Sequence, residues 1–173
     1  MCIRDIARTK RDDLFSPTPT IYAMRILFLL AMIEHKEIRI GDFSSAFLNA
    51  TLDEPVFVIP PKILGRQGKL WKVKKAWYGL RQAPQAFSRF LAGIFESLGF
   101  QRSKSCPMIF HHPQGIDTAC HVDDPVTVGS VDGNAWFFNE LQQRLKFKPG
   151  PAFGLTPVKY LGKTLPKASQ QRD

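Results

Sequence analysis

Residues 119–130 read ACHVDDPVTVGS and place two adjacent aspartates, Asp123 and Asp124, between two short runs of β-forming residues. Residues 118–122 and 126–128 predict two strands, so the aspartates lie at the tip of a hairpin. Aspartate is a common turn residue that hydrogen-bonds to its own backbone, so the pair taken alone favours a solvated loop. The alternative is a site for a divalent metal, and the choice between them depends on the rest of the sequence.

Helical and strand-like patterns alternate around this hairpin. Thr20 can cap a helix whose middle is apolar on all sides and which is therefore expected to be buried. A second helix has apolar residues spaced by three and four and stops at Gly99. Predicted helices cover residues 21–36, 84–98 and 134–145; predicted strands cover 37–43, 56–59, 69–74, 108–111, 118–122, 126–128 and 158–165, with a polar loop at 44–50. This interleaving indicates an α+β or α/β class.

The net charge of the chain is basic. Its 173 residues suit one domain or a piece of a larger one, and they include 24 Lys and Arg against 15 Asp and Glu, a net +9. This balance favours a polyanionic partner such as nucleic acid. Solubility alone explains the charge equally well, and a membrane surface is a weaker third choice.

The cysteines and the N-terminus give evidence on the cellular compartment of the protein. Three cysteines are an odd number without CxxC spacing, which indicates reduced thiols rather than a zinc site or a disulfide framework. Residues 1–13 are charged and contain no apolar signal core, and the most apolar segment, residues 26–33, is too short to span a bilayer. We therefore expect an intracellular protein, cytoplasmic or nuclear, that does not insert into membranes.

A third aspartate, Asp42, ends the predicted strand 37–43. If that strand lies beside the hairpin, Asp42, Asp123 and Asp124 converge at one edge of a sheet. Three carboxylates repel one another unless cations neutralise them, and hard oxygen ligands suit Mg²⁺. Two such ions about 3.5–4 Å apart stabilise the attacking and leaving oxygens of phosphoryl transfer. The pattern predicts a catalytic site with two Mg²⁺ ions, or Mn²⁺ in their place.

Five blocks of sequence come in a characteristic order: GDFSSAFLNATLDEPVFVIPP, LWKVKKAWYGLRQAPQAF, SLGFQRSKSCPMIF, HVDD and KYLGKTL. Together they resemble the reverse transcriptase of copia-type LTR retrotransposons. In that family the first block has the form D-x-x-x-A-F-L-N-G, the second reads L-Y-G-L-K-Q-A-P-R-A-W, and Y-V-D-D lies on a hairpin. The resemblance covers residues 15–165.

The resemblance implies a polymerase palm-type antiparallel sheet with packed helices and partial fingers. Asp42, Asp123 and Asp124 match the catalytic, metal-binding aspartates. Phe47 matches an aromatic residue beneath the incoming sugar, where a flat ring leaves no room for a 2′-hydroxyl; outside the motif it would be an ordinary core phenylalanine. The residues that match the nucleotide pocket are Arg81, Gln82, Ala83 and Pro84, and those that match primer-positioning segments are His121, Val122, Lys159, Tyr160, Leu161 and Gly162.

The same resemblance predicts a basic lead-in with partial fingers at residues 1–19, the palm and fingers at residues 20–165, and a polar tail at residues 166–173. The basic residues of the lead-in, Arg4, Arg8, Lys10 and Arg11, are either a remainder of the fingers or a solvated tail. The expected function is that of an RNA-directed DNA polymerase domain of a retrotransposon polyprotein. Its partners would be dNTPs, an RNA or DNA template with its primer, and other parts of the polyprotein.

Two alternatives remain open. One is an inactive nucleic-acid-binding remnant of a degenerate element, because His121 stands in place of the tyrosine of Y-V-D-D and Pro125 follows the aspartates. A proline at that position removes a hydrogen bond from the strand. The other alternative is an α+β domain that uses the aspartates for a different metal-dependent phosphotransfer.

Overall fold

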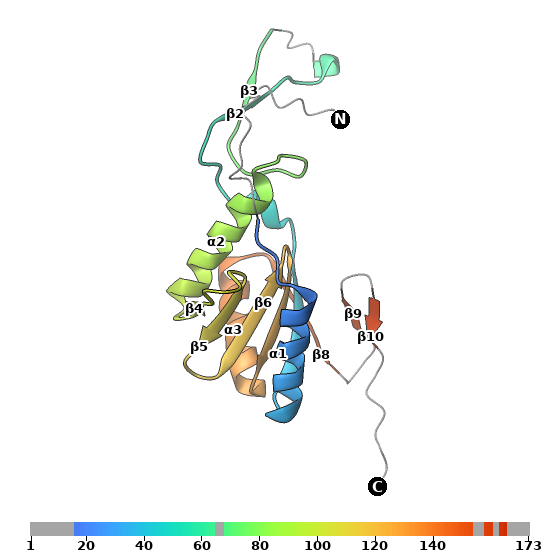
Figure 1. Cartoon of the computed structure of the whole chain (residues 1–173). Helices are drawn as coiled ribbons and strands as arrows, with labels where there is room; N and C mark the ends of the chain where they lie inside the picture. The colour runs from blue at the N-terminus through green and yellow to red at the C-terminus, as the bar shows by residue number, and fades with distance from the viewer. Residues whose placement is uncertain (1–15, 65–67, 154–157, 161–162, 166–173) are drawn as a thin grey trace. The chain divides into compact units, whose positions relative to one another are not determined.

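The computed structural model describes residues 16–64, 68–153, 158–160 and 163–165 (Figure 1). The chain divides into two compact units. The hairpin unit comprises Met1–Ser16 and Ser45–Gly93, and the sheet unit comprises Pro17–Ser44 and Ile94–Asp173, so that the boundary falls inside α2 (Ala83–Ser97). Most of the predicted lead-in and all of the predicted polar tail lie outside the described residues.

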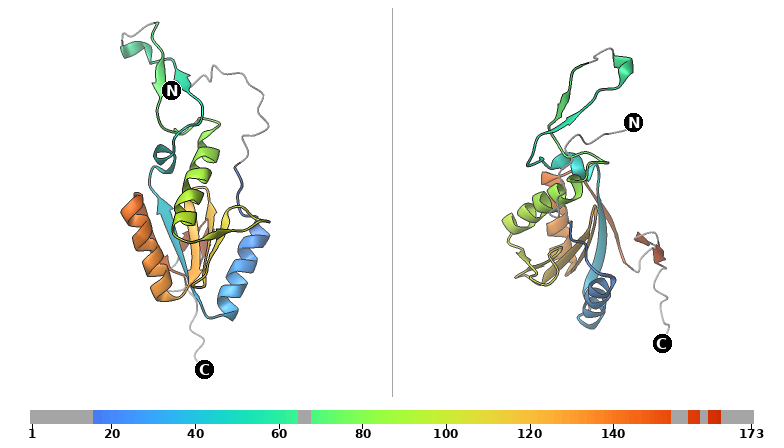
Figure 2. Two further views of the ribbon diagram at one scale, coloured as in Figure 1. Left: turned by 90° about the vertical axis from the view of Figure 1, so that its left-hand side faces the viewer. Right: turned by 45° about the horizontal axis from the view of Figure 1, so that its top comes forward.

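A six-stranded antiparallel sheet forms the centre of the sheet unit, in the order β4-β5-β6-β7-β1-β8. Helices α1 (Ile21–Ile33) and α3 (Val131–Arg144) lie against opposite faces of it (Figure 2). The strands are β1 (Glu37–Phe43), β4 (Gln101–Arg102), β5 (Ile109–His112), β6 (Ile116–His121), β7 (Asp124–Gly129) and β8 (Phe147–Ala152), with β9 (Val158–Tyr160) and β10 (Lys163–Leu165) pairing separately. Helices packed on an antiparallel sheet confirm the α+β class.

The two faces of this sheet have different cores. The face toward α1 is largely aliphatic, with a core of Met24, Leu27, Ala31, Ile38, Ile40, Ala119, Val126, Val128 and Tyr160. The opposite face is aromatic, and the ring of Phe95 lies edge-on to those of Phe110 and Phe137, with centroids 5.0 and 5.3 Å apart. Because successive side chains of a strand point to opposite faces, the even-numbered residues of β1 face α1.

The helix α1 is less buried than its sequence predicts. Its buried residues form one stripe, while Tyr22, Ile26, Leu29 and Ile33 on the outward face are between 57 and 73% exposed. A single sheet face covers only one side of a helix, so an apolar composition all round does not ensure full burial. The helix ends at Ile33, before the predicted residue 36, because His35 takes a positive φ of 52° and turns the chain into β1. In the described residues, no helix is both long and apolar enough to cross a membrane.

The edge strand β8 was not predicted, because its sequence, FKPGPA, contains two prolines and a glycine. Such residues are tolerated at the edge of a sheet, where a strand needs hydrogen-bond partners on one side only. The register of β1 against β8 shifts between Arg39 and Gly41. The last predicted strand, 158–165, is instead the two paired strands β9 and β10, with residues 161–162 outside the described set.

Gly150 makes the close approach of β8 to β1 possible. A Cβ at this position would lie far inside contact distance of the backbone carbonyl oxygen of Ile40, which cannot move without displacing β1. We expect Gly150→Ala to destabilise the protein by roughly 1–3 kcal/mol, measured by urea unfolding. Gly93→Ala is the matched control, because a Cβ there meets nothing within 4 Å and the residue lies inside α2. Gly93→Ala should stabilise the protein by up to about 1 kcal/mol. Equal effects of the two variants on stability would contradict the argument that β8 and β1 approach closely at Gly150.

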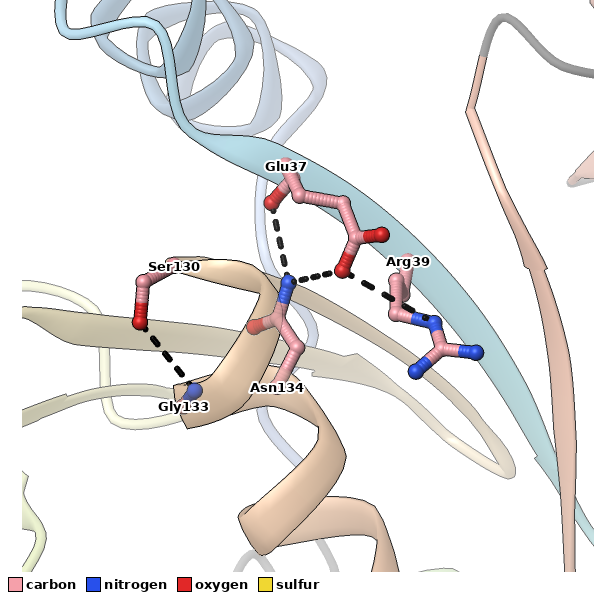
Figure 3. A network of polar contacts seen from close by, with 5 residues as sticks. All are labelled: Glu37, Arg39, Ser130, Gly133 and Asn134. Carbon is pink, nitrogen blue, oxygen red and sulfur yellow. Dashed lines mark hydrogen bonds and ion pairs between the residues drawn. The ribbon is translucent and has the colours of Figure 1, made fainter.

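The start of α3 is joined to the start of β1 by polar contacts (Figure 3). The helix begins at Val131 rather than at residue 134, because the Ser130 hydroxyl accepts a hydrogen bond from the N–H of Gly133 at 3.1 Å. The buried Asn134 side chain donates to the carbonyl oxygen of Glu37 at 3.1 Å and to its carboxylate at 3.0 Å. The helix is thereby fixed to the strand that carries Asp42.

The hairpin unit contains a small two-stranded sheet and the first part of α2. Its elements are η1 (Ala46–Asn49), β2 (Val56–Val58), η2 (Lys62–Leu64) and β3 (Trp71–Val73). The segment 44–50, predicted as a polar loop, contains the 3₁₀ helix η1. Burial of Ala46 and Phe47 and a hydrogen bond from the Asn49 side chain to the carbonyl oxygen of Ala46, at 3.1 Å, stabilise this turn.

Candidate active site

Three aspartates meet where β1 ends and β7 begins. Asp42 is the next-to-last residue of β1, Asp123 lies in the turn between β6 and β7, and Asp124 is the first residue of β7. The backbone N–H of Phe43 donates to the carbonyl oxygen of Asp123 at 3.0 Å, which joins the end of β1 to the turn. The tertiary structure therefore brings the three predicted catalytic residues to one edge of the sheet.

The strand pleat places two of these carboxylates on the same face. Asp42 follows Ile38 and Ile40 at even spacing, and Asp124 precedes Val126 and Val128 in the same way, so both share the face covered by α1. His121 of β6 pairs directly with Asp124, so its side chain lies on this face as well. Of the three carboxylates, Asp42 is exposed to solvent and the other two are half-buried.

The carboxylates influence one another electrostatically. Burial raises the pKa of Asp124, the negative charges of Asp123 and Asp42 raise it further, and His121 acts in the opposite direction. A raised carboxyl pKa means that the ionised form is disfavoured. A bound cation would stabilise the ionised form and so lower this pKa. In the described parts of the chain, no three or more His, Cys, Asp or Glu side chains are gathered tightly enough to hold a metal ion, so the two-ion site stays a prediction.

The turn that carries the aspartates has an unusual backbone. Val122 has a φ of +59°, which β-branched residues rarely adopt. The favoured two-residue hairpin turns require a positive φ at their first residue, and Val122 occupies that position between the paired His121 and Asp124. The buried Cys120 thiol donates to the carbonyl oxygen of Val122 at 3.3 Å. Burial, followed by the charges of Asp123 and Asp124, raises the pKa of Cys120, so the group remains a thiol that can donate.

Replacing Val122 tests whether this turn is strained. A non-glycine residue in the left-handed region costs about 1–2 kcal/mol, a cost that glycine avoids. We therefore expect Val122→Gly to be more stable than Val122→Ala by about 1 kcal/mol, measured by urea unfolding. At position 93, where a Cβ meets nothing within 4 Å, the Gly93→Ala variant should be more stable than the wild type. An alanine variant as stable as the glycine variant at position 122 would mean that the turn holds no strain.

Pro125 lies within the hairpin without breaking it. The pairing of β6 with β7 continues through Cys120 opposite Pro125 to His121 opposite Asp124. The register of β1 with β7 runs from Glu37–Gly129 to Ile40–Val126 and stops before the proline, which has no N–H to donate. The bond between Phe43 and Asp123 restores the connection beyond it. The hairpin therefore keeps its acidic tip in place next to β1.

Phe47 lies in an aromatic cluster of the hairpin unit. Its side chain is 9% exposed and its ring meets those of Tyr78 and Phe87 edge-on, with centroids 4.6 and 6.0 Å apart. Tyr78 is half-exposed, and sequence reasoning missed it although it belongs to the WYGLRQAP block. The remaining nucleotide-pocket residues lie at and just before the start of α2: Arg81 is exposed, Gln82 and Pro84 are partly buried, and Ala83 is buried.

Tyr160 lies close to the aspartates. It belongs to the buried core on the α1 face, and its hydroxyl has no hydrogen-bond partner among the described residues. Burial raises the pKa of Tyr160, and the neighbouring Cys120 and Asp124 raise it further. Lys159 lies beside it in β9, whereas Leu161 and Gly162 fall outside the described residues. The predicted role of this segment in primer positioning stays a prediction.

Comparison with known proteins places this geometry in context. Residues 2–164 match a protein family described as reverse transcriptase (RNA-dependent DNA polymerase). The retrovirus-related Pol polyprotein from transposon TNT 1-94 of Nicotiana tabacum is 27% identical over 129 residues, 70% of this chain and 10% of the relative. The retrovirus-related Pol polyprotein from transposon RE1 of Arabidopsis thaliana is 32% identical over 124 residues, which are 68% of this chain and 8% of the relative. The transposon Ty1-BL Gag-Pol polyprotein of Saccharomyces cerevisiae is 29% identical over 129 residues, and the chain spans 7% of its length.

Proposed function

The chain belongs to the reverse transcriptase (RNA-dependent DNA polymerase) family, and we propose that it carries the nucleotidyl-transfer site of a retrotransposon polyprotein. The observation that carries this proposal is the convergence of Asp42, Asp123 and Asp124 at one edge of the sheet, where burial and then the charges of Asp123 and Asp42 raise the pKa of Asp124. Carboxylate oxygens are the ligands that Mg²⁺ prefers, so the donor set fits the expected cofactor.

The proposed reaction joins a dNTP to a primer. The primer 3′-hydroxyl loses its proton to solvent and attacks the α-phosphorus of the dNTP. A new P–O bond forms, the bond from the α-phosphorus to the bridging oxygen breaks, and pyrophosphate leaves. Mg²⁺ bound to the three aspartates would supply positive charge that stabilises the attacking and leaving oxygens. The turn at Val122, with its positive φ of 59°, and the hydrogen bond from Phe43 to Asp123 place the two adjacent aspartates beside the end of β1.

The residues that match the nucleotide pocket are proposed to contact the dNTP. Arg81 is exposed at the start of α2, where its guanidinium can bind a phosphate of the dNTP or of the template. The ring of Phe47, held edge-on by Tyr78 and Phe87, would pack against the sugar and exclude a 2′-hydroxyl. His121, paired with Asp124, is the group proposed to contact the primer end.

Metal binding is testable without measuring activity. Mg²⁺ that binds only the folded protein stabilises it by mass action, so the melting temperature should rise with added Mg²⁺. Asp42→Asn and Asp124→Asn should abolish this rise, whereas Asp132→Asn, which changes an exposed carboxylate at the start of α3, should retain it. A rise that persists in both site variants would contradict the assignment of the ligands. The readout is differential scanning fluorimetry at several Mg²⁺ concentrations.

The pH dependence of this stabilisation follows from Asp124. Its pKa is raised in the folded protein, so the folded state binds a proton more tightly than the unfolded state. In the absence of metal, stability therefore falls as pH rises from the unfolded pKa through the raised folded value. Added Mg²⁺ should reduce this fall, and its effect should vanish on the acidic side, where protonated Asp124 no longer binds it. A Mg²⁺ effect that is constant through this pH window would contradict the role given to Asp124.

Primer extension on an RNA template is the direct test of the function. The chain should add dNTPs to a labelled primer in the presence of Mg²⁺ or Mn²⁺. A protein that binds primer–template without extending it under any of these conditions would support the alternative of an inactive nucleic-acid-binding remnant. Neither binding nor extension would contradict both.

A further inference from the structure

A surface cavity of about 510 Å³ lies in the sheet unit, between the turn that joins β5 to β6 and the start of α3. Small-molecule sites typically have volumes of ~300–1,000 Å³, so this cavity is large enough for a ligand. The described residues that line it are His112, Gln114, Ser130, Asp132, Gly133 and Trp136. The cavity lies where β6 begins and β7 ends, whereas Asp42, Asp123 and Asp124 lie at the opposite end of these strands.

Two aromatic rings form one wall of the cavity. The rings of His112 and Trp136 have centroids 5.2 Å apart and are tilted by 46°. The ring of Phe100 also packs against His112, with centroids 4.9 Å apart. The backbone N–H of Gln114 donates to Nδ1 of His112 at 3.2 Å, which fixes the orientation of this ring. The wall is therefore already formed, and a partly exposed tryptophan ring attracts cations to its face.

The charge of the cavity favours a cation over an anion. With histidine counted as neutral, Asp132 is the only charged side chain of the lining, and it makes no ion pair with another described residue. A helix start contributes about half a positive charge, which the full negative charge of Asp132 outweighs. The N–H of Gly133 already donates to the Ser130 hydroxyl at 3.1 Å, so it is not available to an anion (Figure 3).

The buried side chain of Asn134 adds negative partial charge on the same side of the helix. This side chain is fully buried, and its Oδ1 has no hydrogen-bond partner among the described residues. Figure 3 shows that this oxygen points away from Glu37, toward the side on which Ser130 lies. An amide dipole in this orientation stabilises a nearby positive charge and disfavours a negative one.

We propose that the cavity binds the guanidinium group of an arginine from a protein partner. The planar guanidinium would stack on the ring of Trp136 and donate two parallel hydrogen bonds to the carboxylate of Asp132. A lysine ammonium has the same charge but neither the planar shape nor the paired donors. A nucleic-acid phosphate would meet the charge of Asp132 and no Lys or Arg among the lining residues. The inference does not rest on the proposed function.

The test is an NMR titration of the ¹⁵N-labelled full chain with N-acetylarginine amide, without nucleotide, nucleic acid or Mg²⁺. The chain has three tryptophans, and the indole N–H signal of Trp136 is the one that Trp136→Phe removes. We expect this signal to shift saturably with a dissociation constant of about 1–10 mM, because one small cation makes few contacts. The signals of Trp71 and Trp77, which belong to the hairpin unit, should not shift.

Altered ligands and variants identify the contacts. N-acetylcitrulline amide has the shape of the arginine compound without its charge and should bind about tenfold more weakly. Asp132→Asn should weaken binding of the arginine compound by about the same factor, and binding of the citrulline compound by about threefold or less. The matched control is Glu140→Gln, which removes the same charge from the last turns of α3 and should leave both affinities unchanged. N-acetyllysine amide should bind at least about threefold more weakly than the arginine compound.

Four results would overturn the proposal. The first three are an unshifted Trp136 signal at about 50 mM arginine compound, equal affinities for the arginine and citrulline compounds, and wild-type affinity in Asp132→Asn. The fourth is a shift of the Trp136 signal by inorganic phosphate at lower concentrations than the arginine compound requires, which would indicate an anion site. None of these measurements involves metal, primer or dNTP, so failure here leaves the tests of the three catalytic aspartates unaffected.

Discussion

Primer extension is expected to fall by about a thousandfold or more when Asp42 is replaced by asparagine. Asparagine keeps the size of the side chain and one carboxylate-like oxygen but loses the negative charge that would bind Mg²⁺. A cation at the reacting oxygens is worth several kcal/mol of transition-state stabilisation, and about 4 kcal/mol corresponds to the expected loss. The same effect is expected for Asp123→Asn and Asp124→Asn. The measurement is single-nucleotide extension of a labelled primer on an RNA template.

Template binding separates this catalytic effect from misfolding. Each of these substitutions removes a negative charge from a surface that faces a polyanion, so affinity for primer–template should be unchanged or higher. Burial is the largest cause of the raised pKa of Asp124, and the charges of Asp123 and Asp42 add to it. Removing one of these charges should also stabilise the fold at neutral pH in the absence of metal, because like-charge repulsion is reduced. The exposed Asp132→Asn serves as the control and should extend as the wild type does. An Asp42→Asn variant that retains activity within tenfold would remove Asp42 from the catalytic site.

Phe47→Val is expected to raise the use of ribonucleotides relative to deoxyribonucleotides by roughly a hundredfold. The ring packs edge-on against those of Tyr78 and Phe87, which restricts its rotation. Valine removes the far part of the ring and opens space for that hydroxyl. The measurement is single-nucleotide extension with GTP and with dGTP on one template, compared between variant and wild type.

Loss of packing alone must be distinguished from loss of a steric gate. Phe87→Val removes the same volume from the same aromatic cluster, since Phe87 is also buried, and it should lower stability without changing the ratio of GTP to dGTP use. Unchanged discrimination in an active Phe47→Val variant would leave Phe47 as a core residue only. An equal change in both variants would assign the effect to general loosening of the cluster.

Local patterns in the sequence predicted the order and type of most elements. The alternation in EIRIGDF gives β1 its observed bounds, and the spacing of apolar residues locates α2 to within a residue at each end. These features depend on backbone periodicity, which is read from residues close together in the chain. The convergence of Asp42 with the Asp123–Asp124 pair was predicted only on the condition that β1 lies beside the hairpin, and the long-range pairing of β1 with β7 meets that condition.

Other features were decided only by the tertiary structure. The strand β8 exists because β1 offers an unpaired edge, although two prolines and a glycine argue against it locally. The outer face of α1 is exposed because only one sheet face is available to cover the helix. The positive φ of Val122 arises from closing the hairpin in two residues, and Tyr160 lies near Asp124 through contacts between distant segments. Sequence alone therefore determined the elements and the chemistry they carry, whereas edges, burial and backbone strain were set by which elements pack together, an arrangement that no local pattern encodes.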